Sequence, residues 1–144
     1  MNGDSLLQPV RVSAEQVDLV APLFDAYRQF YGQPPDLDGA RRFLAQRLGQ
    51  GESVIFAVVQ AGRPLGFTQL YPSFSSVSMR PIWVLNDLYV AEGARRRGVG
   101  ARLLGAARDH ALSTGAVRLV RHLRHHLPFI AEKRVALGIG GPSS

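Results

Sequence analysis

The sequence predicts an α/β (α+β) fold in which a central mixed β-sheet is flanked by helices, and three observations support this. The chain has 144 residues, 46% hydrophobic and 19% charged, which suits one domain with one core over residues 1–144. Its segments alternate between strand and helix periodicity in the order β-α-α-β-β-β-α-β. The segment Ile82–Val90 is almost wholly apolar, as expected of a central strand that is buried on both faces.

The first half of the chain begins with a short strand at Pro9–Val12. A long helix is expected to start at Ser13, because this residue and the Gln three positions later match a capping box. Apolar residues at helical spacing continue the helix to Tyr31, where Gly and Pro residues follow. Asp38 is expected to cap a second helix, which ends at Gly49.

The pattern then changes to that of strands. Ser53–Gln60 and Pro64–Tyr71 are expected to form a hairpin, because both are rich in β-branched or aromatic residues. Pro72–Arg80 is rich in serine and is expected to be a loop. The strand Ile82–Val90, a helix at Gly98–Leu112 and a fifth strand at Val117–Val120 complete the order.

Composition excludes several classes of protein. The chain has no cysteine, which rules out disulfides, thiolate metal sites and a cysteine nucleophile and fits a cytoplasmic protein. No apolar run approaches the roughly 18 residues of a membrane span, and Met1–Gln8 does not look like a secretory signal. The net charge is +6, but the Arg residues are scattered without interleaved aromatic residues. We therefore expect neither a nucleic-acid partner nor a membrane partner.

The segment Leu88–Gly100 leads from a buried strand into an amphipathic helix and is the most informative part of the sequence. Gly98 and Gly100 lack a Cβ and would let an anion approach the backbone N–H groups at the helix start. Three consecutive Arg residues add positive potential there. The alternative interpretation is an ordinary helix start with packing glycines and solvated arginines. The motifs of P-loop and dinucleotide-binding proteins are absent.

The pattern Arg95-x-x-Gly98-x-Gly100, directly after a strand that ends in Leu-x-Val, resembles the acetyl-CoA signature of the GNAT superfamily of N-acetyltransferases. With the order of elements, the resemblance covers residues 8–120. It implies transfer of the acetyl group of acetyl-CoA to a primary amine, by direct attack in a ternary complex and without a metal. The acceptor would be a small molecule or a peptide.

The resemblance also implies a role for individual positions. In such enzymes the strand before the signature diverges from the next strand and leaves a gap for the thioester. The pantetheine arm would pair with Leu88, Tyr89 and Val90. The pyrophosphate would bind backbone N–H groups of Arg95, Arg96, Arg97, Gly98, Val99, Gly100 and Ala101.

Catalytic residues are expected on the same strand. Asn86 and Asp87 should point to opposite faces, and Asp87 is the candidate base for the amine. The alternative is that Asp87 is only a polar residue satisfied by neighbouring backbone. Tyr89 is a candidate proton donor to the thiolate. Tyr27, Tyr31 and Tyr71 are candidates for a polar substrate-binding wall, although Tyr at such spacing is also common in cores.

The end of the chain departs from the family pattern. Only 24 residues follow Val120, and they contain no Tyr to match the helix Tyr that protonates the thiolate in many relatives. The segment also has no room for a further hairpin of normal size, so the fifth strand should be an exposed edge. We therefore expect a homodimer or larger oligomer with weak or narrow activity. The alternative is a CoA-binding module that has lost catalysis.

Two further hypotheses concern residues 121–144. A shifted reading frame beginning near Val120 would explain the change of composition. His122, His125 and His126 suggest a metal site only weakly, because their spacing does not match a tetrahedral pattern. A nucleic-acid-binding tail also fits poorly, since the cations surround an apolar Leu-Pro-Phe-Ile segment.

Overall fold

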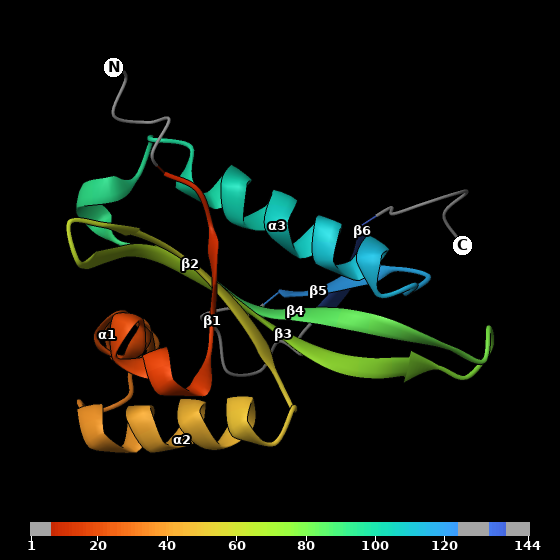
Figure 1. The fold of residues 1–144 in the computed structure, drawn as a ribbon, viewed down its shortest axis with the longest axis horizontal. Coiled ribbons are helices and arrows are strands. Elements are labelled where there is room, and N and C mark those ends of the chain that lie inside the picture. The colour runs from red at the N-terminus through yellow and green to blue at the C-terminus, as the bar shows by residue number, and fades with distance from the viewer. Residues whose placement is uncertain (1–6, 124–132, 138–144) are drawn as a thin grey trace.

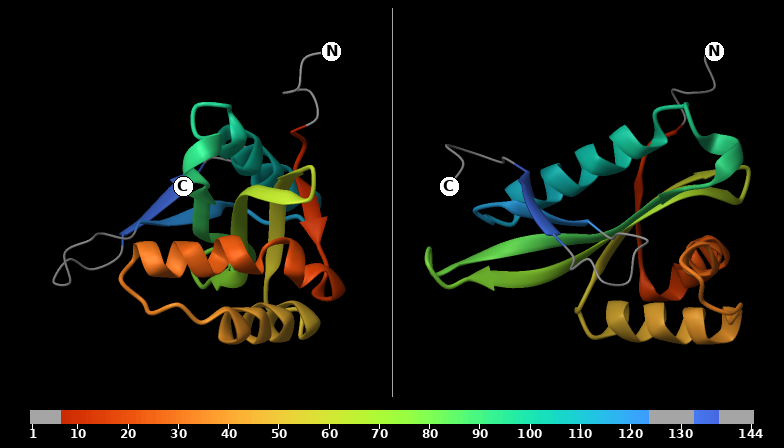
Figure 2. Two further views of the ribbon diagram at one scale, coloured as in Figure 1. Left: turned by 90° about the vertical axis from the view of Figure 1, so that its left-hand side faces the viewer. Right: turned by 180° about the vertical axis from the view of Figure 1, so that it is seen from behind.

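The computed structural model describes residues 7–123 and 133–137, which form a six-stranded mixed sheet with helices on both faces (Figures 1 and 2). The strands lie in the order β1-β2-β3-β4-β5-β6, and all neighbours are antiparallel except β4 and β5, which are parallel. The strands are β1 (Val10–Val12), β2 (Val54–Gln60), β3 (Arg63–Ser75), β4 (Arg80–Val90), β5 (Leu119–Leu123) and β6 (Lys133–Leu137). The predicted fold class is confirmed.

The helices divide between the two faces of the sheet. The α-helices α1 (Ala21–Phe30) and α2 (Leu37–Gly49) cover one face, and α3 (Val99–Ser113) covers the other (Figure 1). Short 3-10 turns at Ala14–Leu19 and Glu92–Ala94 precede α1 and α3. Each face has its own buried cluster, with Phe24, Tyr27 and Phe67 on the α1–α2 side and Leu70, Leu85 and Ala107 on the α3 side. Among the described residues, no helix has the length and hydropathy of a bilayer-spanning segment.

The first two helices differ in detail from the sequence-based expectation. Ser13 does begin a helical segment, and its backbone N–H donates to Gln16 Oε1 at 3.1 Å. The segment is a 3-10 turn, and α1 starts afresh after Val20, because Pro lies in the first turn of α1. The cap of α2 is Asp36 and not Asp38, since Asp36 Oδ1 accepts a hydrogen bond from Gly39 N–H at 2.9 Å.

The prediction of a loop at Pro72–Arg80 was wrong, because β3 and β4 continue through most of it as a long antiparallel arm. Pro72 pairs with Trp83, and the last pair joins Ser75 to Arg80. The end of this arm extends away from the helices (Figure 1), and its side chains are exposed. The serines in this segment therefore indicate that the arm is exposed to solvent, and they do not prevent it from forming strands.

The expectation of an exposed fifth strand was also wrong. β6 pairs with β5 in antiparallel register from Leu119↔Leu137 to Leu123↔Lys133, so the tail does contribute a further strand. The argument for oligomers from an unpaired β5 therefore fails, and the oligomeric state stays a prediction. His125, His126 and the side chain of His122 lie outside the described residues.

Close packing between α3 and the sheet depends on Gly66 of β3. A Cβ at this position would lie 2.7 Å from Val99 Cγ1 and 3.1 Å from Leu103 Cδ1. These contacts belong to the first turns of α3, so Gly66 sets how closely the N-terminal end of α3 approaches β3. Gly105, in the middle of α3, has open space where a Cβ would stand.

We expect Gly66→Ala to destabilise the fold by about 1–3 kcal/mol, because the added methyl overpacks the contact with α3. The matched control Gly105→Ala should instead stabilise it by about 0.5–1 kcal/mol, the usual gain for Ala over Gly within a helix. Urea unfolding of both variants measures the two free energies. Equal effects of the two substitutions would contradict this account of Gly66.

His110 of α3 packs edge-on against Trp83 and Phe56, with ring centroids 4.8 and 5.8 Å away. Burial lowers the pKa of this imidazole below its ordinary value of 6.5, and the charge of Arg11 lowers it further. The folded protein therefore binds this proton less readily than the unfolded chain does.

The unfolding free energy should accordingly contain a term that is complete above pH 6.5 and is lost as the pH falls through the lowered pKa of His110. In His110→Gln this term is absent. We expect the melting temperature of the wild type to fall more than that of His110→Gln between pH 7.5 and pH 5.5, as measured by thermal unfolding. Parallel pH dependences of the two proteins would show that His110 does not titrate in this way.

Candidate functional site

A β-bulge in β4 organises the centre of the sheet. Gln69 of β3 pairs with Asp87, whereas the next residue, Leu70, pairs with Leu85, so Asn86 is an extra residue on β4. Leu85 packs in the cluster on the α3 side, and Asp87 contacts Tyr27 of α1 on the opposite side. In a regular strand, residues two apart share a face, so the bulge is what turns Asp87 toward α1.

The pairing of β4 with β5 ends at the same place. The described pairs run from Trp83↔Leu119 to Leu85↔Arg121, and β4 continues to Val90 without β5 beside it. Its other edge stays paired with β3 as far as Gly66↔Val90. One edge of β4 is therefore free of β5 from Asn86 onward, which is the strand divergence that the sequence resemblance implied.

The carboxylate of Asp87 accepts three side-chain hydrogen bonds while its residue is only 5% exposed. Tyr27 OH donates to Oδ1 at 2.7 Å, Gln69 Nε2 donates to Oδ2 at 2.8 Å, and Asn86 Nδ2 donates to Oδ2 at 3.2 Å. Thr68 Oγ1 also donates to the main-chain oxygen of Asp87 at 2.8 Å. The buried charge is thus stabilised by neutral donors from β3, β4 and α1.

The expectation that Asn86 and Asp87 point to opposite faces was wrong. Their side chains are hydrogen-bonded to each other, because the bulge interrupts the alternation of the strand at Asn86. The alternative interpretation, in which neighbouring backbone satisfies Asp87, also changes, since side chains supply the three bonds to its carboxylate.

Four aromatic rings lie beside this carboxylate. Tyr27 contacts the rings of Tyr31 and Tyr89 at centroid distances of 5.2 and 5.5 Å, and Phe30 contacts the same two rings at 5.2 and 6.0 Å. Tyr27 is buried, Tyr31 and Tyr89 are half-buried, and Phe30 is 53% exposed. Tyr71 lies two residues from Gln69 on β3 and so belongs to the same face of the sheet.

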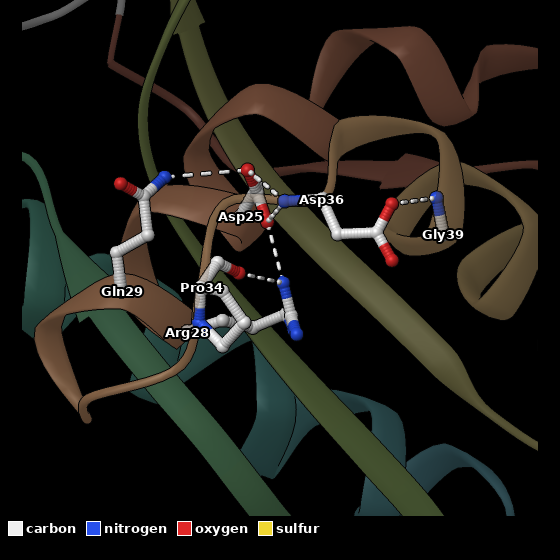
Figure 3. Close-up of polar contacts among 6 residues, drawn as sticks. All are labelled: Asp25, Arg28, Gln29, Pro34, Asp36 and Gly39. Atoms are coloured by element: carbon white, nitrogen blue, oxygen red, sulfur yellow. Dashed lines mark hydrogen bonds and ion pairs between the residues drawn. The ribbon is translucent and has the colours of Figure 1, made fainter.

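The chain that connects α1 and α2 begins at Tyr31 and is fixed by the buried carboxylate of Asp25 (Figure 3). Asp25 accepts hydrogen bonds from Arg28 Nη1 at 2.6 Å, Gln29 Nε2 at 3.2 Å and the backbone N–H of Asp36 at 3.1 Å. Arg28 Nη1 also donates to the carbonyl oxygen of Pro34 at 3.2 Å. One carboxylate thus ties the end of α1 to the cap of α2.

The loop before α3 turns sharply into the helix. Arg96 and Gly98 have left-handed φ angles of 70° and 78°, and left-handed residues of this kind occur in the backbone turns that bind anions. The first backbone hydrogen bond of α3 is donated by the N–H of Arg102 to the carbonyl oxygen of Gly98, at 3.1 Å. The N–H groups of the turn before Arg102 therefore lack an acceptor within the helix and carry the positive end of its dipole.

Two of the three arginines of this loop have side-chain contacts that fix the loop in place. Arg95 Nε donates to the carbonyl oxygen of Val90 at 3.2 Å, and its guanidinium lies 5.8 Å from the ring centre of Tyr89. Arg97 Nη2 donates to Gln60 Oε1 at 3.3 Å. Arg95 and Arg97 therefore anchor the loop to β4 and β2, and Arg96, which is exposed, adds positive charge beside the backbone N–H groups.

Sequence reasoning missed Gln69, Gly66 and Asp25. The polar side chain of Gln69 in a mostly apolar strand could have indicated a special role. The sequence gives no indication of the β-bulge in β4 that brings Asp87 to this side chain. Within residues 7–123 and 133–137, no cluster of three or more His, Asp or Glu residues could hold a metal ion.

Comparisons with known proteins agree with this arrangement. The family model of the acetyltransferase (GNAT) family matches residues 20–129. An uncharacterized N-acetyltransferase of Bacillus subtilis, YhfO, is 53% identical over 107 residues, which are 74% of this chain and 72% of the relative. A probable acetyltransferase of Haemophilus influenzae is 37% identical over 113 residues, 76% of this chain and 77% of that protein.

Solved structures show the same fold. The crystal structure of a probable acetyltransferase has 49% identity and a TM-score of 0.73, with 79% of this chain and 77% of that chain covered. An aminoglycoside acetyltransferase from an uncultured soil sample, in complex with sisomicin, has 20% identity and a TM-score of 0.71, with 85% and 81% covered. With the bulged strand and the glycine loop in place, these matches establish that the chain belongs to the GNAT family of acetyltransferases.

Proposed function

We propose that this protein transfers the acetyl group of acetyl-CoA to a primary amine, by direct attack of the amine on the thioester within a ternary complex. Members of the family use acetyl-CoA as the acetyl donor. The observation that carries the proposal is the free edge of β4 beyond Leu85, which leads to the N-terminal end of α3 and its N–H groups without an acceptor in the helix. The acceptor is a small-molecule or peptide amine.

The donor half of the site fits the extended shape of acetyl-CoA. The pyrophosphate would accept hydrogen bonds from the backbone N–H groups of residues 96–101, at the positive end of α3, whereas the N–H of Arg95 donates to the oxygen of Glu92. The pantetheine arm carries two amides and would pair with the main chain of Leu88–Val90 along the edge that β5 leaves free. This places the thioester near Asn86, Asp87 and the aromatic rings.

The acceptor half supplies a route for the proton. The amine nitrogen attacks the thioester carbon, the new C–N bond forms and the C–S bond breaks. Because Asp87 is buried, we propose that it takes the amine proton through the hydroxyl of Tyr27, which passes its own proton to Oδ1. Tyr89 is the candidate donor of a proton to the thiolate, so that free CoA leaves as a thiol, and the proton held by Asp87 then replaces the one that Tyr89 has given.

Substitutions in the glycine loop test the binding of acetyl-CoA. A Cβ at Gly100 would meet only Val90 Cγ2, at 3.8 Å, so Gly100→Ala should bind within about threefold of the wild type, since this is ordinary van der Waals contact. Gly100→Asp and Gly98→Asp place a carboxylate against the pyrophosphate, and we expect binding to weaken by about 100-fold or more. Isothermal titration measures the affinities. A folded Gly100→Asp variant with unchanged affinity would show that the cofactor binds elsewhere.

Turnover tests the reaction itself. Because the chain has no cysteine, a thiol reagent reports released CoA without background from the protein. We expect acetylation of at least one amine in a broad panel, and Asp87→Asn should lower kcat by about 10²–10⁴-fold, the usual contribution of a general base. The affinity for acetyl-CoA should change little. Tight binding of acetyl-CoA without acetylation of any amine would favour the alternative, a CoA-binding module without catalysis.

A further inference from the structure

Gln69 of β3 is a fully buried amide whose presence stability alone does not explain. Its Nε2 donates to Asp87 Oδ2 at 2.8 Å, whereas its Oε1 has no hydrogen-bond partner among the described residues. A buried acceptor without a partner destabilises the folded state, because it has lost its hydrogen bonds to water. A methionine has nearly the same length and would fill the same space without this cost. The amide therefore needs another reason to be there.

The hydrogen-bond geometry of Asp87 supplies that reason. The carboxylate is held at both oxygens, by Tyr27 at Oδ1 and by Gln69 at Oδ2. Asn86 also donates to Oδ2, but at 3.2 Å and from the bulge itself, where the residue is only half-buried. The strand β3 is the regular partner of the bulged strand, so Gln69 is the donor that fixes Oδ2 from a rigid neighbour.

We infer that Gln69 is a positioning residue for acetyl transfer, and this inference rests on the proposed function. By fixing Oδ2 it keeps Oδ1 directed at the hydroxyl of Tyr27, which is the route proposed for the amine proton. Gln69 acts through Asp87 and need not touch the acetyl donor or the acceptor. Hydrogen bonds to a charged group are among the strongest in proteins, so loss of this one should misplace the base and lower kcat.

Gln69→Met removes the donor and keeps the volume, and Thr68→Val is its matched control. Thr68 is the neighbouring buried residue on β3, and its hydroxyl donates to the main-chain oxygen of the same Asp87 at 2.8 Å. Steady-state kinetics should show kcat reduced by about 10- to 100-fold in Gln69→Met, with the KM for acetyl-CoA within about threefold. Thr68→Val should keep kcat within about threefold of the wild type, even where its melting temperature falls.

A double-mutant cycle separates positioning from a structural role. If Gln69 acts through Asp87, Gln69→Met should change kcat by less than about twofold in an Asp87→Asn background. If the reductions of kcat in Gln69→Met and Asp87→Asn are fully additive, or if Gln69→Met keeps the wild-type kcat, the inference about Gln69 is wrong. Acetyl transfer by the wild type would still support the proposed function. Absence of wild-type acetylation would instead overturn the proposed function, and this inference with it. Acetyl-CoA titration and melting curves verify that each variant is folded.

Discussion

The extra residue at Asn86 is the constraint on which the rest of the site depends. Without it, Asp87 would face α3 together with Leu85, and its carboxylate would enter an apolar cluster. With it, Asp87 faces α1, and the pairing of β4 with β5 stops at Leu85. One inserted residue thus places the buried charge and frees the strand edge on which we propose that the acetyl donor lies.

The buried carboxylate in turn constrains its surroundings. It has no cation beside it in the described hydrogen-bond network, so three neutral donors must remain in place to stabilise it. Tyr27 therefore links α1 to the centre of the sheet, and Asp25, two residues earlier on α1, links the same helix to α2. The half-site beside the aromatic rings is consequently built from groups that cannot shift independently of one another. On the other face of the sheet, the absence of a side chain at Gly66 allows the N-terminal end of α3 to pack closely against β3.

Periodicity was sufficient to predict the class of the fold and most of its elements, because buried faces impose periods of two and of about 3.6 residues. It could not predict the bulge, since Asn86 and Asp87 look like ordinary alternation within an apolar strand. The arm around Ser75 was missed because a strand exposed on both faces has no apolar alternation to detect. β6 was missed for a different reason: its strand structure depends on tertiary pairing with β5, which the local sequence of the tail does not indicate. The glycine loop was predictable because its constraint is local, a left-handed turn at the start of a helix.

A crystal structure with bound CoA would show whether the acetyl donor lies where β4 diverges from β5 at Asn86. We expect pantetheine amides hydrogen-bonded to the main chain of Leu88–Val90, with the pyrophosphate over the N-terminal turn of α3 and the sulfur beside Tyr27 and Asp87. CoA bound on another surface, or β4 and β5 paired along the whole length of β4 in the complex, would contradict this expectation.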